Sequence, residues 1–431
     1  MDSRYFDAYQ LIRKDPRNGE YHVKWGQEPN FRRCLSEAVR DFGIDKDQFR
    51  FTDGGLFNKL HDLLIDVAED HGTDLSEQQF NNEFQYKREI LFSNWLGTDP
   101  DTYTVVFPIM IRSQNFSDEV KLYESKAEQV DDDQWDEFLC AAKGSADSNF
   151  DTFLDELPND IQSDNPLNRR EWTYLKVDIE GRDEFYPLSR AIDLVELRFA
   201  EINFFDQLWA AGMPQPASSS RVPHEKWSRL QRAPFYLIFQ DENYITHRGV
   251  DYDYRRSVGI LHFNQADVDE INEIPTFDYD ADKGTYEGYI VSALLAFQDG
   301  ITERSVRQSF FSFWRGIEIL SKTSNFGKMV DRGEFAVSYH HDGDSSFLPE
   351  TKEAIGEIVD IRHELVHEGL KTDVYQGHRD GAKILLDGLL YLYIQKYGKW
   401  DIDNMASFLK HGVEYQDKIR FVGALLNEFS E

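Results

Sequence analysis

The sequence predicts a multidomain protein in which an α+β region, residues 1–282, is followed by an all-α helical bundle, residues 285–431. Three observations lead to this fold class. The chain has 431 residues, enough for two or three domains with cores of their own. Its first part contains short segments rich in β-branched and aromatic residues between helical patterns. After residue 285, apolar residues recur almost only at helical spacing.

The composition limits the class of protein. Apolar residues make up 40% of the chain and aromatic residues 14%, which is typical of a globular protein and not of a disordered acidic tail. No apolar run approaches the ~20 residues of a membrane span, and the segment 1–6 lacks the apolar core of a signal peptide. Cys34 and Cys140 are too few for a disulfide framework or a cysteine-based zinc site. We therefore expect a reduced, cytoplasmic protein with no membrane partner and no cofactor.

The net charge of −32 is the strongest bulk signal. It fits a protein adapted to concentrated salt, and it fits equally an ordinary acidic cytoplasmic protein. In dilute buffer such a charge repels RNA, whereas at 1 M salt the Debye length is only about 3 Å. A nuclease of this composition would depend on stacking and specific hydrogen bonds more than on long-range attraction.

The first hundred residues are expected to be helical with loops, with helices over Phe31–Phe42 and Leu56–Glu69. The second of these segments and the residues just after it carry four side chains that a metal could use, namely His61, Asp62, Asp66 and His71. The same four fit the exposed face of an amphipathic helix, and no separate second His-Asp pair accompanies them. We therefore expect no metal site here.

Strands and helices then alternate. Thr102–Ile111 is the best strand of the first half, and Pro108 places it at a sheet edge or marks a bulge, because proline cannot donate to the ladder. Trp172–Glu180 alternates apolar and polar residues, as a half-buried strand does. Helices are expected over Asp133–Lys143 and Phe150–Leu157.

A helix over Pro187–Ala211 carries an apolar stripe, formed by Leu188, Ile192, Val195, Phe199 and Ile202. Residues 215–220 resemble a linker, and strands are expected over Ala233–Gln240 and Ser257–Phe263. The loop between these strands, Asp241–Arg256, bears His247, Arg248, Arg255 and Arg256 among tyrosines. Such a mixture can stack on nucleotides, but an ordinary hairpin tip with local ion pairs explains it better.

The C-terminal part is expected to be an up-down bundle. We expect one long helix from Tyr286 to about Lys322, an inserted loop over 323–350, a helix over 358–367 and further helices over Asp380–Tyr397, Met405–Leu409 and Ile419–Phe429. The first helix has an aromatic face around Phe310, Phe311 and Trp314. That face looks larger than one helix can cover, which predicts a homodimer formed through the bundle.

The segment 358–369 combines an apolar face with Arg362, His363 and His367, and Gly369 is a natural helix stop. On a regular helix His363 and His367 lie about 40° apart, whereas Arg362 and His367 diverge by roughly 140°. Arg362 and His367 can therefore meet on one ligand only if the helix ends near His367, or if a symmetry-related copy supplies the missing half.

The motif resembles the signature of HEPN domains. In that signature an arginine is followed by a polar residue, three further residues and a histidine, with an apolar run before the motif and a glycine after it. The segment Ile361–Gly369 (IRHELVHEG) is most similar to the ApeA-like HEPN branch, and the resemblance covers residues 285–431. It implies a helical, dimeric, metal-independent ribonuclease of a defence or toxin system. It assigns acid–base chemistry to His367, phosphate stabilisation to Arg362, and the variable polar position to His363. Gly369 replaces the tyrosine on which some HEPN toxins are silenced, so that route of control is not expected.

Three functional hypotheses follow. In the first, the chain cleaves RNA through the 2′-hydroxyl, with residues 1–282 as a sensor that binds a regulatory ligand or partner. In the second, it is a catalytically silent HEPN-type dimer that binds RNA, a nucleotide or another protein as a scaffold. In the third, the bundle is an interaction module in which Arg362 and His367 are structural. Arg362 and His363 would then simply form ion pairs with Asp360 and Glu364. No trio of metal ligands surrounds the motif, so the first hypothesis predicts cleavage without a divalent ion.

Overall fold

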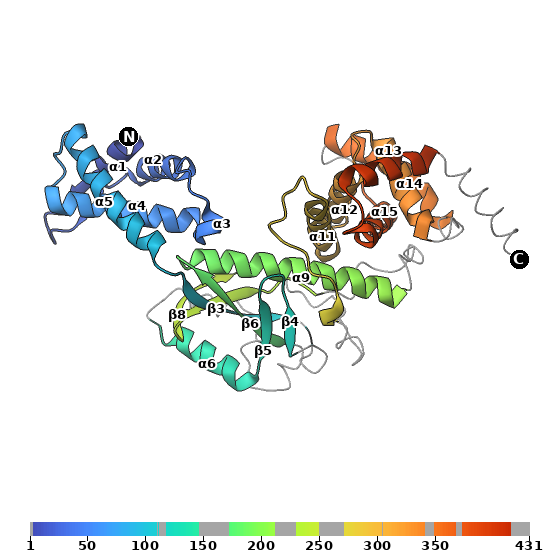
Figure 1. The fold of residues 1–431 in the computed structure, drawn as a ribbon, viewed down its shortest axis with the longest axis horizontal. Coiled ribbons are helices and arrows are strands. Elements are labelled where there is room, and N and C mark those ends of the chain that lie inside the picture. The colour runs from blue at the N-terminus through green and yellow to red at the C-terminus, as the bar shows by residue number, and fades with distance from the viewer. Residues whose placement is uncertain are drawn as a thin grey trace, which may run out of the picture.

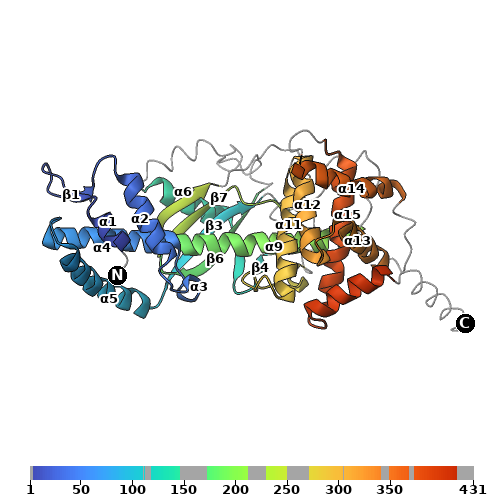
Figure 2. The ribbon, with the colours of Figure 1, turned by 90° about the horizontal axis from the view of Figure 1, so that it is seen from above.

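The computed structural model describes residues 3–109, 111, 118–145, 172–211, 230–249, 271–303, 305–340, 349–367 and 373–414. The molecule is elongated: a group of N-terminal helices lies at one end, an antiparallel sheet in the middle and a helical bundle at the other end (Figure 1). The helix α9 (Phe185–Ala211) runs along the sheet and reaches both helical ends (Figures 1 and 2). The chain is thus α+β, with its sheet ahead of the C-terminal helices.

The N-terminal helices form a core of their own. They are α1 (Ser3–Tyr9), α2 (Glu28–Arg40), α3 (Lys46–Phe49), α4 (Asp53–His71) and α5 (Glu77–Gly97), with a short antiparallel hairpin, β1 (Ile12–Lys14) and β2 (Tyr21–Val23). The α4 leucines at helical spacing, Leu56, Leu60, Leu63 and Leu64, are buried in this core. The helices predicted over 31–42 and 56–69 are confirmed by α2 and α4.

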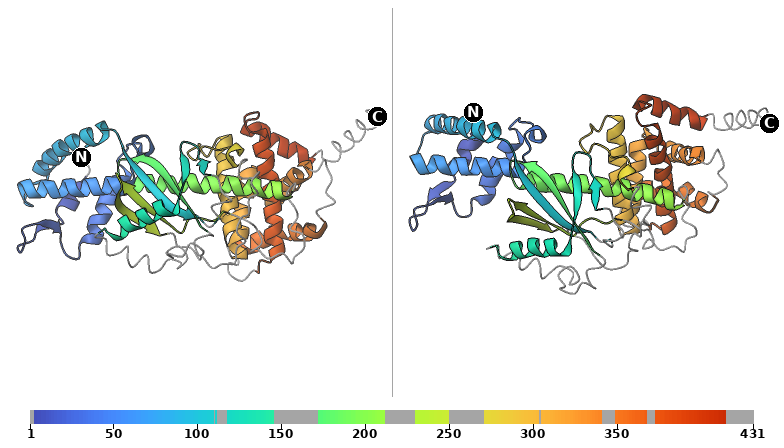
Figure 3. Two further views of the ribbon diagram at one scale, coloured as in Figure 1. Left: turned by 90° about the horizontal axis from the view of Figure 1, so that it is seen from below. Right: turned by 60° about the horizontal axis from the view of Figure 1, so that its bottom comes forward.

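The sheet has the strand order β4-β5-β6-β3-β7-β8, with every neighbouring pair antiparallel. Its strands are β3 (Asp101–Ile109), β4 (Glu119–Lys121), β5 (Lys126–Val130), β6 (Thr173–Gly181), β7 (Phe235–Gln240) and β8 (Asn243–Gly249). The two-residue period of β3 divides its side chains between two apolar clusters. Val105 and Phe107 pack with α9, and Val106 packs with α6 (Asp132–Lys143). Figure 3 shows these two helices on opposite faces of the sheet.

The strands predicted over 102–111 and 172–180 and the helix predicted over 133–143 are confirmed. Pro108 does not mark a bulge, because the register of β3 with β6 is continuous there. Strand β3 lies between β6 and β7, but Pro108 lies beyond its ladder with β7, so the predicted edge holds only locally. Proline is tolerated there because the ladder with β7 covers only Thr104–Val106. The ranges 150–157, 215–220 and 257–263 lie outside the described residues.

The predicted loop over 241–256 is wrong in its first half. Residues 243–249 form β8, which pairs with β7 through a tight turn at Asp241 and Glu242, both with positive φ. His247 and Arg248 therefore lie on a strand, opposite Leu237 and Tyr236. Arg255 and Arg256 lie outside the described residues.

Helix α9 is buried on two faces. The predicted stripe faces the sheet, with Leu188, Val195 and Phe199 buried against it. The opposite side, through Leu197 and Phe204, belongs to the core of the C-terminal bundle. The sequence analysis identified only the first face, so it placed no contact between α9 and the bundle.

The bundle contains α11 (Tyr286–Thr302), α12 (Val306–Ser321), α13 (Phe326–His340), α14 (Pro349–His367), α15 (Gln376–Lys396) and a helix over 402–414. The predicted single helix over 286–322 is wrong: it is divided before Ser305, which caps α12 by accepting a hydrogen bond from the Gln308 amide. The division lets α12 fold back on α11 (Figure 1).

Two further expectations for this region are corrected. The predicted loop over 323–350 contains α13, whose Gly333 lies against Leu385 of α15, so glycine allows close helix packing here rather than a loop. The aromatic face is covered by the chain itself, because Phe310 and Trp314 are almost fully buried in the bundle core. It therefore offers no argument for a dimer. Within the described parts of the chain, no helix combines the length and apolar character needed to cross a membrane.

Candidate functional site

The predicted motif lies at the C-terminal end of α14. Ile358 and Ile361 are buried as predicted, and α14 is described as far as His367, so the predicted stop at Gly369 lies outside the described residues. Gly381 of α15 lets Ile358 approach closely, since a Cβ there would be 3.2 Å from the isoleucine Cδ1. His378 of α15 also lies 2.8 Å from the carboxylate of Glu357, so α14 is fixed against α15.

Arg362 points into the bundle. Its Nη2 donates to Oε1 of Glu318 on α12 at 3.1 Å, and its guanidinium lies 5.1 Å from the ring centroid of Phe326 on α13. The same Glu318 oxygen accepts from the indole nitrogen of Trp314 at 2.6 Å. The indole of Trp314 fixes the Glu318 carboxylate, and this carboxylate and the Phe326 ring together define one orientation for Arg362. The arginine side chain is only 17% exposed.

The remaining donors of Arg362 are not satisfied by the part of the chain that the structure describes. Both Nε and Nη1 are buried and lack a hydrogen-bond acceptor there. A buried donor without an acceptor costs roughly 1–3 kcal/mol and calls for an explanation. Glu318 thus orients the guanidinium, while two of its nitrogens have no acceptor among the described residues.

The segments that hold Arg362 differ in charge along the sequence. Residues 304–332, which include α12 and the start of α13, carry six Lys or Arg and two Asp or Glu. Helix α14 itself carries five acidic residues and two basic ones. The side chain that meets Arg362 from α12 is nevertheless the acidic Glu318.

The backbone of α14 does not place positions 363 and 367 on the side of Arg362. His363 is exposed. Because α14 continues through residue 367, positions 362 and 367 lie about 140° apart around its axis, and positions 363 and 367 about 40° apart. The side chain of His367 lies outside the described residues. One helix therefore places the arginine and the two histidine positions on different sides.

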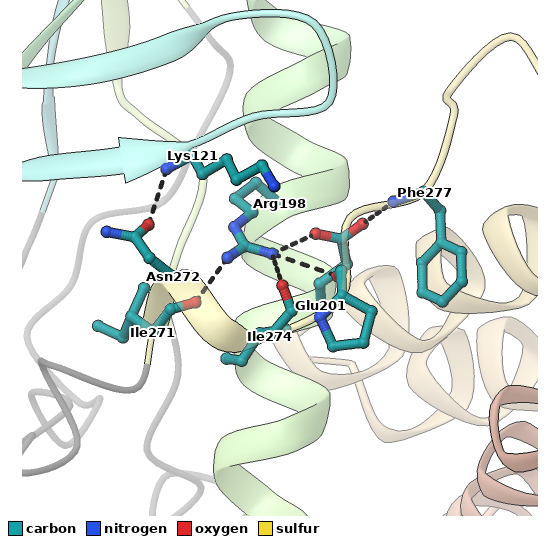
Figure 4. A network of polar contacts seen from close by, with 8 residues as sticks. Lys121, Arg198, Glu201, Ile271, Asn272, Ile274 and Phe277 are labelled. Carbon is teal, nitrogen blue, oxygen red and sulfur yellow. Dashed lines mark hydrogen bonds and ion pairs between the residues drawn. The ribbon is translucent and has the colours of Figure 1, made fainter.

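A second polar cluster joins α9 to residues 271–277, the segment that leads into the bundle, and it was not predicted from the sequence (Figure 4). Arg198 donates to the carboxylate of Glu201 at 2.7 Å and to the carbonyl oxygens of Ile271 and Ile274, while Glu201 accepts from the amide of Phe277 at 2.8 Å. Burial raises the pKa of Glu201 to about 7, although the guanidinium of Arg198 opposes that rise.

Arg232 makes a second link of this kind. It contacts Glu196 of α9 at 3.0 Å and Asp299 of α11 at 2.8 Å. Burial raises the pKa of both carboxyls, and Arg232 opposes the rise. An i,i+3 Arg-Glu pair in an amphipathic helix was the only sequence signal of these links, and it is too common to identify a buried contact.

The metal-capable residues of α4 do not converge. His61 contacts Asp62 at 3.1 Å, and His71 contacts Glu83 of α5 at 3.4 Å. Among the described residues, no group of three or more His, Cys, Asp or Glu side chains is placed to hold a metal ion.

The chain was compared with protein-family models, with curated proteins and with solved structures. No match was found in any of the three comparisons. The function must therefore be argued from the site itself.

Proposed function

We propose that the chain is a metal-independent endoribonuclease of a defence or toxin type, and that its site is the HEPN-like motif of α14. The observation that supports this proposal is the state of Arg362. A carboxylate and a ring fix its guanidinium, and two buried nitrogens have no acceptor among the described residues. A phosphate oxygen is the acceptor that a planar guanidinium binds best.

The chemistry requires one base, one acid and a stabiliser of negative charge. A histidine at position 367 accepts the proton of the RNA 2′-hydroxyl, whose oxygen then forms a bond to phosphorus. Arg362 stabilises the negative charge that builds on the phosphate oxygens. The bond from phosphorus to the 5′-oxygen breaks, and this oxygen takes the proton that His367 has accepted, so that one histidine serves first as the base and then as the acid. The products are a 2′,3′-cyclic phosphate and a 5′-hydroxyl, and no divalent ion takes part.

The divergence of positions 362 and 367 leads us to include a homodimer in this proposal. A two-fold axis near the end of α14 would bring Arg362 of one copy towards His367 of the other. Light scattering of the full chain in high salt should then give twice the mass of one chain. A monomer that retains full cleavage activity would exclude this arrangement.

The test is cleavage of labelled RNA by the purified full chain. We expect Arg362→Ala to lower the rate about 100-fold or more, and His367→Ala by a similar factor, because each removes a transition-state contact. His363→Ala should have a smaller effect. Arg315→Ala and His411→Ala, which remove exposed residues of the same bundle, should leave the rate unchanged.

Cleavage should persist in excess chelator, and RNA with a 2′-deoxy sugar at the cut position should resist it. Activity that chelator removes and magnesium restores, with 5′-phosphate products, would contradict the mechanism. Wild-type activity in both Arg362→Ala and His367→Ala would show that the site is assigned wrongly.

The ion pair of Arg362 with Glu318 favours a second candidate, a catalytically silent bundle that acts as a scaffold. In that case Arg362 serves stability alone. Arg362→Ala and Glu318→Ala should each destabilise the chain by about 1–2 kcal/mol, and the double variant by less than their sum. No cleavage by the wild type, together with this non-additivity, would select the scaffold.

A further inference from the structure

The hairpin β1–β2 carries an unusual exposed side chain. Trp25, which directly follows Lys24 at the end of this hairpin, is 87% exposed, more than any other large apolar side chain in the described part of the chain. Gly26 has φ +78 and sets the turn that leads into α2. An indole on the surface of a folded chain commonly marks a binding site.

The segment around this hairpin has a positive net charge, opposite in sign to that of the whole chain. Residues 13–40 carry seven Lys or Arg and four Asp or Glu, a net charge of +3 in a chain of −32. Arg13, Lys14, Arg17 and Lys24 are exposed, and among the described residues none of them forms an ion pair. Their charge is therefore available to a partner.

Local contacts hold these side chains in place. Arg13 and His22 face each other across the hairpin, with Nε of the arginine 3.4 Å from Nε2 of the histidine. Nζ of Lys14 lies 5.6 Å from the ring centroid of Tyr21. The Lys24 ammonium donates to the carbonyl oxygen of Gln10 at 2.5 Å, which fixes the backbone next to Trp25.

We propose that this basic hairpin, which includes Arg13, Lys14, Arg17, His22, Lys24 and Trp25 and presents Arg13 and Lys14 on opposite faces, binds an unpaired stretch of RNA. Cations beside an exposed aromatic ring form the combination that binds single strands, since phosphates meet the cations and a base stacks on the ring. A duplex keeps its bases stacked on one another and cannot use Trp25 in this way. The inference rests on the proposed function, because it names where the RNA substrate is held.

Because of its position in the molecule, this hairpin can contribute to the binding of long RNAs but not of short ones. The hairpin and α14 lie at opposite ends of the molecule, separated by the length of α9 (Figure 2). A helix of 27 residues is about 40 Å long. A long RNA can reach both places, whereas a dinucleotide held at α14 cannot reach the hairpin. The acidic helix α14 then needs to bind only the phosphate that is cut.

The test measures binding by fluorescence anisotropy of a labelled single-stranded RNA to the full chain carrying Arg362→Ala, so that cleavage does not interfere. Adding Trp25→Ala should weaken binding about tenfold, the loss of one base–aromatic stack. Arg13→Gln with Arg17→Gln should lower the slope of log affinity against log salt by about 1.4, or about 0.7 for each phosphate contact. Tyr86→Ala, at another exposed aromatic residue of the N-terminal helices, and Lys143→Gln are the matched controls.

In the cleaving wild type, Trp25→Ala should raise KM for a long RNA and leave the cleavage of a dinucleotide unchanged. Unchanged binding in Trp25→Ala would overturn the proposal. So would equal affinity for duplex and single-stranded RNA, or displacement of the RNA by polyglutamate at equal charge, which would indicate an acidic protein partner. RNA binding that depends on Trp25 in a chain that never cleaves would support the hairpin and contradict the proposed nuclease.

Discussion

The carboxylate of Asp183 accepts four hydrogen bonds where the N-terminal helices meet the sheet. Its donors are the amide and hydroxyl of Thr52 and the amides of Phe185 and Tyr186, at 2.8 to 3.1 Å. It therefore caps the start of α9 and holds the residue that caps α4. A Cβ at Gly55 would lie 2.1 Å from this carboxylate, so glycine is required beside it.

We expect Asp183→Ala to destabilise the chain by about 2–4 kcal/mol, because several amides and a hydroxyl lose a charged acceptor at once. Asp183→Asn should cost less, since its amide oxygen can still accept from Phe185 and Tyr186. Urea unfolding of both variants measures this order. Wild-type stability in Asp183→Ala would mean that the contacts between α4 and α9 do not depend on this carboxylate.

At the scale of elements, glycines on helix faces determine how closely the bundle packs. A Cβ at Gly388 of α15 would lie 2.5 Å from Cγ2 of Val337 and 2.9 Å from its backbone nitrogen in α13. A Cβ at Gly316 of α12 would meet Leu386 of α15 at 2.7 Å. The Val337 contact includes backbone, so α13 as a whole would have to move.

Gly388→Ala should therefore destabilise the chain by about 1–3 kcal/mol through overpacking. Gly356 of α14 provides the matched control, because a Cβ there would meet nothing within 4 Å. Gly356→Ala should stabilise the chain by about 0.5–1 kcal/mol, since alanine favours the helix. Thermal unfolding of the two variants should shift in opposite directions; a shift in the same direction would contradict this account of the packing.

At the scale of the whole molecule, buried carboxyls and the excess negative charge both make the folded chain less stable as pH rises. Burial raises the pKa of Glu196, Glu201 and Asp299 between α9 and the bundle, and also that of Asp387 within α15. When the pKa of a carboxyl is higher in the folded chain than in the unfolded chain, the folded chain binds more protons at any pH between these two pKa values. The stability from these groups is therefore present at mildly acidic pH and is lost as pH rises.

We expect the chain to unfold at a higher temperature at pH 5 than at pH 7.5, by a difference of about 1–3 kcal/mol in stability. For Glu201 the window runs from its ordinary pKa of 4.5 to about 7, so Glu201→Gln should flatten part of the profile. Salt should raise stability at both pH values, because it screens the repulsion of a chain with net charge −32. A stability that rises from pH 5 to pH 7.5 would contradict this prediction.

Periodic patterns alone determined several elements of the fold. The sequence predicted the strands β3 and β6, the helices α2, α4, α6 and α15, and the sheet-facing side of α9. These segments are amphipathic, and the spacing of their apolar residues indicates a helix or a strand directly. The α+β class and the place of Arg362 and His363 on one helix followed in the same way. Glycine caused the chief error, since Gly333 predicts a loop by its propensity but serves a close contact with Leu385 in the structure.

Only the tertiary structure decided which side chains meet. It placed Arg362 against Glu318 and Phe326, from helices more than thirty residues away in the sequence. It also joined α9 to residues 271–277 through Arg198 and Glu201, and to α11 through Arg232. It also buried the aromatic face in its own chain and left Trp25 exposed. The physical reason is that a sequence period specifies which face of an element is apolar, whereas the partner of that face depends on how distant elements pack.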